Sequence, residues 1–353
     1  MYKTPYKMGK RNTTQPDSHW EELDLDYTIT KPTIICLGGN GTKNPEQANY
    51  ICKVAQNLIG LKDKTIENEW PTVEDVDVIG ISYGEGYFIS SLGNARLTGQ
   101  GSSLSNDERE QIVSQLFTPL IARNNQRLST EDAMQNISLI TFFSFCQGAF
   151  ETQSLLNKLE QQMLYFGYRV PECEQILKQV VSVSYAPSTT ISNVTRFDIK
   201  SFKDFMFSFS HDYEVNCGKN FLTLSGNELV RDADKYNNPN GMSLYSDNLT
   251  NNFPYINEHH LSVIERNDTN WVLETQHYNE IVYLGKNADE ASQCAGYVLS
   301  SSVVAGLKNQ INGSFTPKPD INALYNDCCS IIGQSPITAT TEIDFGAMYV
   351  SEK

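Results

Sequence analysis

The chain has 353 residues, and its 39% of hydrophobic and 10% of aromatic residues are enough for a packed core and too many for a disordered chain. It carries 27 Lys and Arg against 42 Asp and Glu, which gives a net charge of −15 at pH 7. This acidity argues against nucleic acid as a partner, because contacts with phosphates need a basic surface.

Apolar runs that are typical of buried strands alternate along the chain with segments that have helical spacing. The predicted strands cover residues 33–37, 76–82, 138–144, 180–185 and 221–225, with a further β-type stretch at 261–275. The predicted helices cover residues 45–60, 106–123, 148–166, 171–178 and 288–310. Strands that are apolar on both faces and separated by helices predict an α/β fold, with a mostly parallel sheet covered by helices on both faces.

The remaining segments are polar. We expect an irregular lead-in over residues 1–25, one domain over 26–315 and a C-terminal tail over 316–353. Within the domain, residues 86–105 and 232–258 are expected to be lid or cap insertions. No apolar run approaches the ~20 residues of a membrane-spanning helix, and the basic N-terminus lacks the apolar centre of a Sec signal peptide. We therefore expect a cytoplasmic protein without a transmembrane segment.

Eight cysteines are spread irregularly along the chain: Cys36, Cys52, Cys146, Cys173, Cys217, Cys294, Cys328 and Cys329. Because disulfide frameworks are typical of short secreted chains, we interpret these as reduced thiols that mostly lie in the core. The sequence has no C-x-x-C pair, no H-E-x-x-H motif and no EF-hand loop. We expect neither a metal nor another cofactor.

The most informative segment is Ser144-Phe145-Cys146-Gln147-Gly148, which joins a predicted strand to a predicted helix. In open parallel sheets, ligands bind at the carboxyl ends of the strands, so this loop is well placed for function. Small residues two before and two after Cys146 match the G-x-S-x-G nucleophile elbow, whose tight turn needs them. A helix N-terminus also favours a thiolate over a thiol. Cys146 is therefore the candidate nucleophile.

On these residues the chain resembles the α/β-hydrolase superfamily, across most of residues 30–310 and by order of elements rather than by identity. A Cys in the elbow is similar to dienelactone hydrolases and polyester synthases. The run Gly38–Gly41 looks like the glycine-rich oxyanion loop of the superfamily. The resemblance implies that backbone N–H groups of Gly39 or Asn40, together with that of Gln147, hold an oxyanion.

The resemblance also implies a triad in the chain order nucleophile, acid, His. His277 follows the last predicted strand and is the preferred base, with His260 as the reserve. For the acid, Glu228 is the first choice and Asp232 the second, because both follow the predicted strand 221–225. The physical requirement is a carboxylate that accepts the His N–H and stabilises the imidazolium.

These residues imply an acyl hydrolase of the esterase, lipase or thioesterase type, or an acyltransferase, which acts on a small-molecule or lipid substrate through an acyl-Cys146 intermediate. Two alternatives stay open: an inactive binding protein with the same fold, and a cysteine peptidase or deamidase that acts on a protein. The chain is also similar to lipase-like effectors that Legionella-type bacteria inject into host cells. That likeness implies export without a Sec signal and contact with a host protein or membrane.

Each feature also has a purely structural interpretation. Free Cys is among the most buried residue types, so Cys146 could be a core thiol. Gly38–Gly41 could be an ordinary turn that needs a positive φ, or a phosphate-binding loop, although it lacks the G-x-G-x-x-G spacing.

Overall fold

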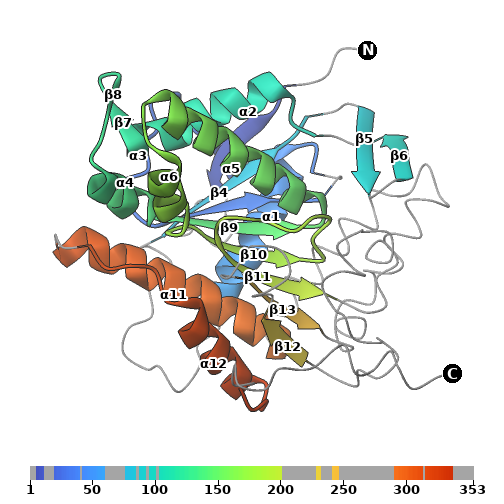
Figure 1. The fold of residues 1–353 in the computed structure, drawn as a ribbon. Helices are drawn as coiled ribbons and strands as arrows, with labels where there is room; N and C mark the ends of the chain where they lie inside the picture. Colours follow the sequence, from blue (N-terminus) through green and yellow to red (C-terminus); the bar gives the residue numbers. More distant parts are fainter. Residues whose placement is uncertain are drawn as a thin grey trace, which may run out of the picture.

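A computed structural model of the protein describes residues 5–11, 20–39, 42–59, 76–84, 87–92, 95–100, 103–200, 228–231, 241–245, 290–312 and 315–336. Within these residues, nine strands form one sheet in the order β12-β13-β11-β10-β9-β3-β4-β1-β2 (Figure 1). In chain order they are β1 (Lys7–Arg11), β2 (Trp20–Glu22), β3 (Thr33–Leu37), β4 (Asp77–Ser82), β9 (Ile140–Phe145), β10 (Val181–Tyr185), β11 (Thr195–Lys200), β12 (Glu228–Arg231) and β13 (Gly241–Tyr245).

The sheet is mostly parallel, as the sequence predicts. The six neighbouring strands from β13 to β4 all run in the same direction. Antiparallel strands flank them, with β12 at one edge and the pair β1–β2 at the other. Two small hairpins lie outside the sheet: β5 (Tyr87–Leu92) with β6 (Ala95–Gln100), and β7 (Ala122–Arg123) with β8 (Gln126–Arg127).

Helices connect and cover the strands. They are α1 (Pro45–Ile59), α2 (Asn106–Ile112), the π-helical turn η2 (Val113–Phe117), α3 (Thr118–Ile121), α4 (Thr130–Ile137), α5 (Gln147–Tyr165), α6 (Val170–Leu177), α11 (Glu290–Asn312) and α12 (Ile321–Ile331). Figure 1 shows α2, α5 and α6 on one side of the sheet and α11 and α12 on the other. No helix in the described part of the chain is both long and apolar enough to cross a membrane.

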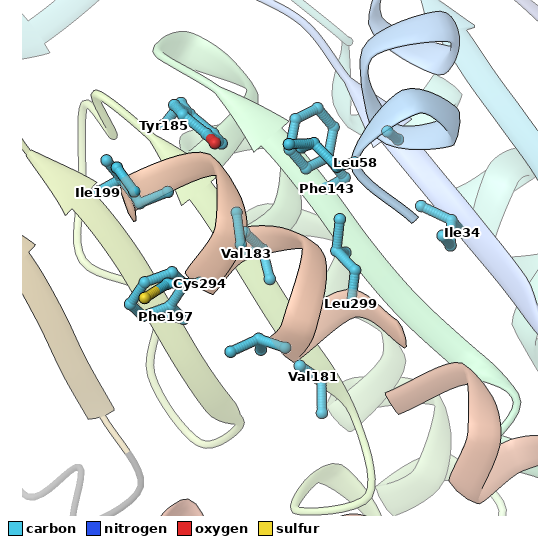
Figure 2. Close-up of a cluster of buried hydrophobic side chains, with 14 of the residues drawn as sticks. Ile34, Leu58, Phe143, Val181, Val183, Tyr185, Phe197, Ile199, Cys294 and Leu299 are labelled. Carbon is cyan, nitrogen blue, oxygen red and sulfur yellow. The ribbon is translucent and has the colours of Figure 1, made fainter. Parts of the chain in front are cut away.

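Two apolar cores lie on opposite faces of the sheet, because each central strand is apolar on both sides. In β3, Ile34 and Cys36 pack into the core shared with α1, α11 and α12, whereas Ile35 and Leu37 pack into the core shared with α2, α5 and α6. Figure 2 shows Leu299 of α11 lying over the strands of the first core. Strands that are apolar on both faces need this double cover, which is the physical basis of the α/β architecture.

Three expectations about polar segments are wrong in part. Residues 7–11, within the expected lead-in, form β1 and pair with β4. Residues 241–245, within the expected cap insertion, form β13 and pair in parallel with β11. Residues 321–331, within the expected tail, form α12, which packs against α11. In each case tertiary pairing stabilises a segment whose own pattern is weak. The predicted strand at 221–225 and the stretch at 261–275 lie outside the described residues.

Candidate active site

Cys146 is the single residue that links β9 to α5. The strand ends at Phe145 and the helix begins at Gln147. The backbone of Cys146 has φ 50° and ψ −115°, which is outside the regions that residues with a Cβ normally occupy. Such strain costs about 1–3 kcal/mol and persists only where the surroundings impose it, most often at functional sites. This is the tight strand-to-helix turn that the elbow motif predicts.

Hydrogen bonds to both neighbours hold this turn. The N–H of Cys146 donates to the carbonyl of Tyr185 at 3.0 Å, which extends the pairing of β9 with β10 by one residue. The carbonyl of Cys146 accepts the N–H groups of Ala149 and Ser188, each at 3.1 Å. Ala186, the first residue after β10, also has a positive φ of 43°. Two strained residues therefore follow neighbouring strands at the same edge of the sheet.

Gly148 places the start of α5 directly on the end of β3. A Cβ at this position would lie 2.0 Å from the carbonyl oxygen of Leu37 and 2.6 Å from its carbonyl carbon. These are backbone atoms of a central strand, so any larger residue would push the helix away from the sheet. Because Leu37 is also the register partner of Ser144, the glycine loop that follows Leu37 lies beside the elbow.

The glycine loop is tied down by hydrogen bonds at its described residues. The carbonyl of Gly38 accepts the phenol O–H of Tyr83 at 2.7 Å. The carbonyl of Gly39 accepts the N–H of Thr42 at 3.0 Å, and the carbonyl of Thr42 accepts the N–H of Tyr83 at 2.8 Å. Of the three predicted oxyanion donors, Gly39 thus lies in the loop beside the elbow, Gln147 is the first residue of α5 directly after Cys146, and Asn40 lies outside the described residues.

The base and the acid are not brought together with Cys146 in the described residues. His277, His260 and Asp232 lie outside them. Glu228 begins the edge strand β12, four strand positions from β9. At ~4.8 Å per strand this is roughly 19 Å, much more than one imidazole ring can bridge. The strand next to β10 is β11, which is not among the strands predicted from the sequence.

Below the elbow, a row of polar residues crosses four strands on the face that α5 covers. The hydroxyl groups of Ser144 and Ser184 are 2.8 Å apart and hydrogen bonded. Asp198 is the register partner of Ser184 and of Ser243, and all four side chains are fully buried. Arg196 donates to Asp198 at 2.5 Å within the sheet. The sequence signal for this row was the alternation of polar and apolar residues along 195–200, the pattern of a strand whose two faces differ.

The thiol of Cys146 differs from the others in its exposure. Cys146 is buried at the end of the core shared with α1 and α11, but the residue is 8% exposed, whereas the other six cysteines in the described ranges are at most 1% exposed. Burial raises the pKa of Cys36, and it raises the pKa of Cys173 to about 11, so these thiols stay protonated at neutral pH. Among the residues that the structure describes, no group of three or more His, Cys, Asp or Glu could hold a metal ion.

A scan against protein-family models found no match for this sequence, and a search of curated proteins found none either. The geometry at the carboxyl edge of the sheet is therefore the basis for assigning a function.

Proposed function

We propose that the protein is an α/β-hydrolase-like acyl hydrolase or acyltransferase that uses Cys146 as its nucleophile. The observation that carries this proposal is the strained backbone of Cys146, with φ 50° and ψ −115°, at a strand-to-helix turn on the carboxyl edge of a parallel sheet. A core thiol gains nothing from this conformation, whereas a nucleophile gains access to a substrate above the sheet.

The proposed reaction has two steps. The thiolate of Cys146 attacks the carbonyl carbon of an ester or thioester, an S–C bond forms, and the carbonyl oxygen takes the negative charge. This intermediate expels an alkoxide or thiolate and leaves acyl-Cys146, whose acyl group then passes to water or to another acceptor. The N–H groups of Gly39 and Gln147 stabilise the oxyanion, and such a donor contributes roughly 3–4 kcal/mol to lowering the barrier.

His277 is the proposed base, which takes the thiol proton and later activates the acceptor. His260 is the alternative. The acid stays open between Glu228 and Asp232, because Asp232 directly follows Arg231, the last residue of the same edge strand that Glu228 begins. The N-terminal end of α5, a helix of 19 residues, supports the thiolate through its dipole.

Acyl donors of several classes test the proposal. Wild-type protein, Cys146→Ala and Cys173→Ala are incubated with p-nitrophenyl esters of increasing acyl length and with acyl thioesters. We expect the wild type and Cys173→Ala to gain one acyl group, mapped to Cys146 by peptide mass spectrometry. Cys146→Ala gains none and releases no p-nitrophenolate above background. Cys173 is the matched control because it is another free thiol, buried in α6.

Full activity of Cys146→Ala on any of these substrates would overturn the assignment. Cleavage or deamidation of peptides, with no ester turnover, would favour the peptidase or deamidase alternative. A folded protein that reacts with none of these substrates would favour the binding-protein alternative.

A further inference from the structure

Tyr83 is a buried residue that holds the glycine loop from below. It directly follows β4, so it lies at the same carboxyl edge as Cys146. Its side chain is fully buried, and its phenol donates to the carbonyl of Gly38 at 2.7 Å. Its backbone N–H donates to the carbonyl of Thr42 at 2.8 Å, beyond the other end of the loop. One residue therefore holds both sides of the loop.

The hydrogen bond from Tyr83 to the carbonyl of Gly38 also fixes the backbone N–H of Gly39. The carbonyl of Gly38 and the N–H of Gly39 belong to one planar trans peptide unit, in which they point in opposite directions. Fixing the carbonyl therefore fixes the direction of the N–H. Two successive glycines give the backbone more freedom to rotate this unit than any other residue pair, so the loop needs an outside anchor to keep one orientation.

We propose that Tyr83 is a positioning residue, which orients the N–H of Gly39 so that it can stabilise an oxyanion formed at Cys146. The inference rests on the proposed function of Cys146. It adds a residue that sequence reasoning missed, and it predicts a defect in one kind of reaction only.

Two reactions of the same thiol separate orientation from stability. In acylation by p-nitrophenyl acetate, the thiolate forms an S–C bond to the carbonyl carbon, an oxyanion develops, and p-nitrophenolate leaves with the electron pair of the broken C–O bond. In alkylation by iodoacetamide, the thiolate displaces iodide in one step and no oxyanion forms. In both reactions the proposed base His277 takes the thiol proton and releases it to the buffer. Only the first reaction depends on the direction of the Gly39 N–H.

Tyr168 offers a matched control far from this edge of the sheet. Its side chain is also buried, and its phenol donates to the carbonyls of Ile121 at 2.7 Å and Leu128 at 2.9 Å. Tyr168→Phe and Tyr83→Phe therefore each remove a phenol that donates to buried backbone carbonyls, and each should cost stability of the same order, about 1–3 kcal/mol.

The experiment compares wild-type protein with these two variants in both reactions, with the first turnover of p-nitrophenyl acetate followed by p-nitrophenolate release. For Tyr83→Phe we expect acylation about 10- to 100-fold slower, because a misdirected donor loses most of its effect, and unchanged alkylation of Cys146. For Tyr168→Phe we expect both rates to be unchanged.

If Tyr83→Phe is acylated as fast as the wild type, the inference is overturned and the proposed function still stands. Equal losses in acylation and alkylation would also overturn it, because they indicate a general disturbance of the elbow. Absence of acylation at Cys146 in the wild type would overturn the proposed function itself, and the inference with it.

Discussion

At the scale of single residues, Cys146 sits in a backbone conformation that suits glycine better than cysteine. We therefore expect glycine at position 146 to give a more stable protein than alanine, the reverse of the usual order. An ordinary Ala-to-Gly exchange lowers stability, but at φ 50° glycine removes the strain that alanine keeps. We expect Cys146→Gly to be more stable than Cys146→Ala by about 1 kcal/mol in urea unfolding. Ala149→Gly, in the first turn of α5, is the control and should lose about 1 kcal/mol. A Cys146→Gly variant less stable than Cys146→Ala would show that the turn is unstrained.

A second prediction concerns Gly148, where a Cβ would meet backbone atoms of Leu37. Gly148→Ala should lower the free energy of unfolding by about 1–3 kcal/mol, as expected for overpacking against a central strand. The matched control is Gly306→Ala in α11, where the closest contact would be 3.2 Å and where alanine favours the helix. Chemical denaturation of both variants checks this. If Gly148→Ala and Gly306→Ala are equally stable, α5 does not pack as closely on β3 as the structure shows.

Lys318 is a buried amine far from the candidate site. It donates to the carbonyl of Ser302 at 2.8 Å and lies within 3.4 Å of the hydroxyl of Thr141, and burial lowers its pKa from 10.5 to about 7. The unfolded chain therefore binds more protons than the folded one between these values, and stability rises with pH there. The cost of a buried charge is fully present below pH 7.

We expect Lys318→Met to remove this dependence. Relative to the variant, the unfolding free energy of the wild type should rise by up to about 1.4 kcal/mol per pH unit from neutral toward pH 10. Unfolding in urea at a series of pH values measures the difference. Parallel pH profiles for the two proteins would show that Lys318 keeps its ordinary pKa in the fold.

At the scale of elements, β11 carries the pair Arg196–Asp198 inside the sheet. Removing one partner of a buried ion pair leaves an uncompensated charge, whereas replacing both can be nearly neutral. We expect Asp198→Asn to cost about 3–5 kcal/mol, and the double variant Arg196→Met/Asp198→Leu to cost less than this single change. Urea unfolding of the wild type, of Asp198→Asn and of the double variant measures these costs. If the double variant is less stable than Asp198→Asn, the charge that Arg196 keeps in Asp198→Asn does not carry the expected cost.

The elements differ in how well the sequence predicts them. The strand at 138–144 and the helix from 148 were predictable because both faces of the strand are apolar and the helix has regular spacing. β1 was missed because its residues are mostly basic, and Arg11 is accommodated by hydrogen bonds to Gln56 and Asn49 of α1 rather than by solvent. β11 was missed because its buried polar face is neutralised by an ion pair, a contact that one segment alone does not reveal.

At the scale of the whole molecule, the parallel sheet brings distant loops to one edge. Residues 38–39, 83–84, 146–148 and 186–188 follow four of its strands and meet there, although more than 100 residues of sequence separate the first loop from Cys146. The tight turn at Cys146 and the glycine turn after β3 were predictable because each has a local motif. The distance of Glu228 from Cys146 depends on strand order, and the bond from Tyr83 to Gly38 is a tertiary hydrogen bond, and neither has a local signature.

The most direct test of the central claim is the pH dependence of Cys146 alkylation by iodoacetamide, in wild-type protein and in His277→Ala. A faster rate alone would not suffice, because Cys146 is already the most exposed of the cysteines in the described ranges. The account predicts that alkylation persists well below the ordinary thiol pKa of ~8.5, and that His277→Ala shifts the profile up to that value. A wild-type profile centred at ~8.5 in folded protein would contradict an activated nucleophile at Cys146.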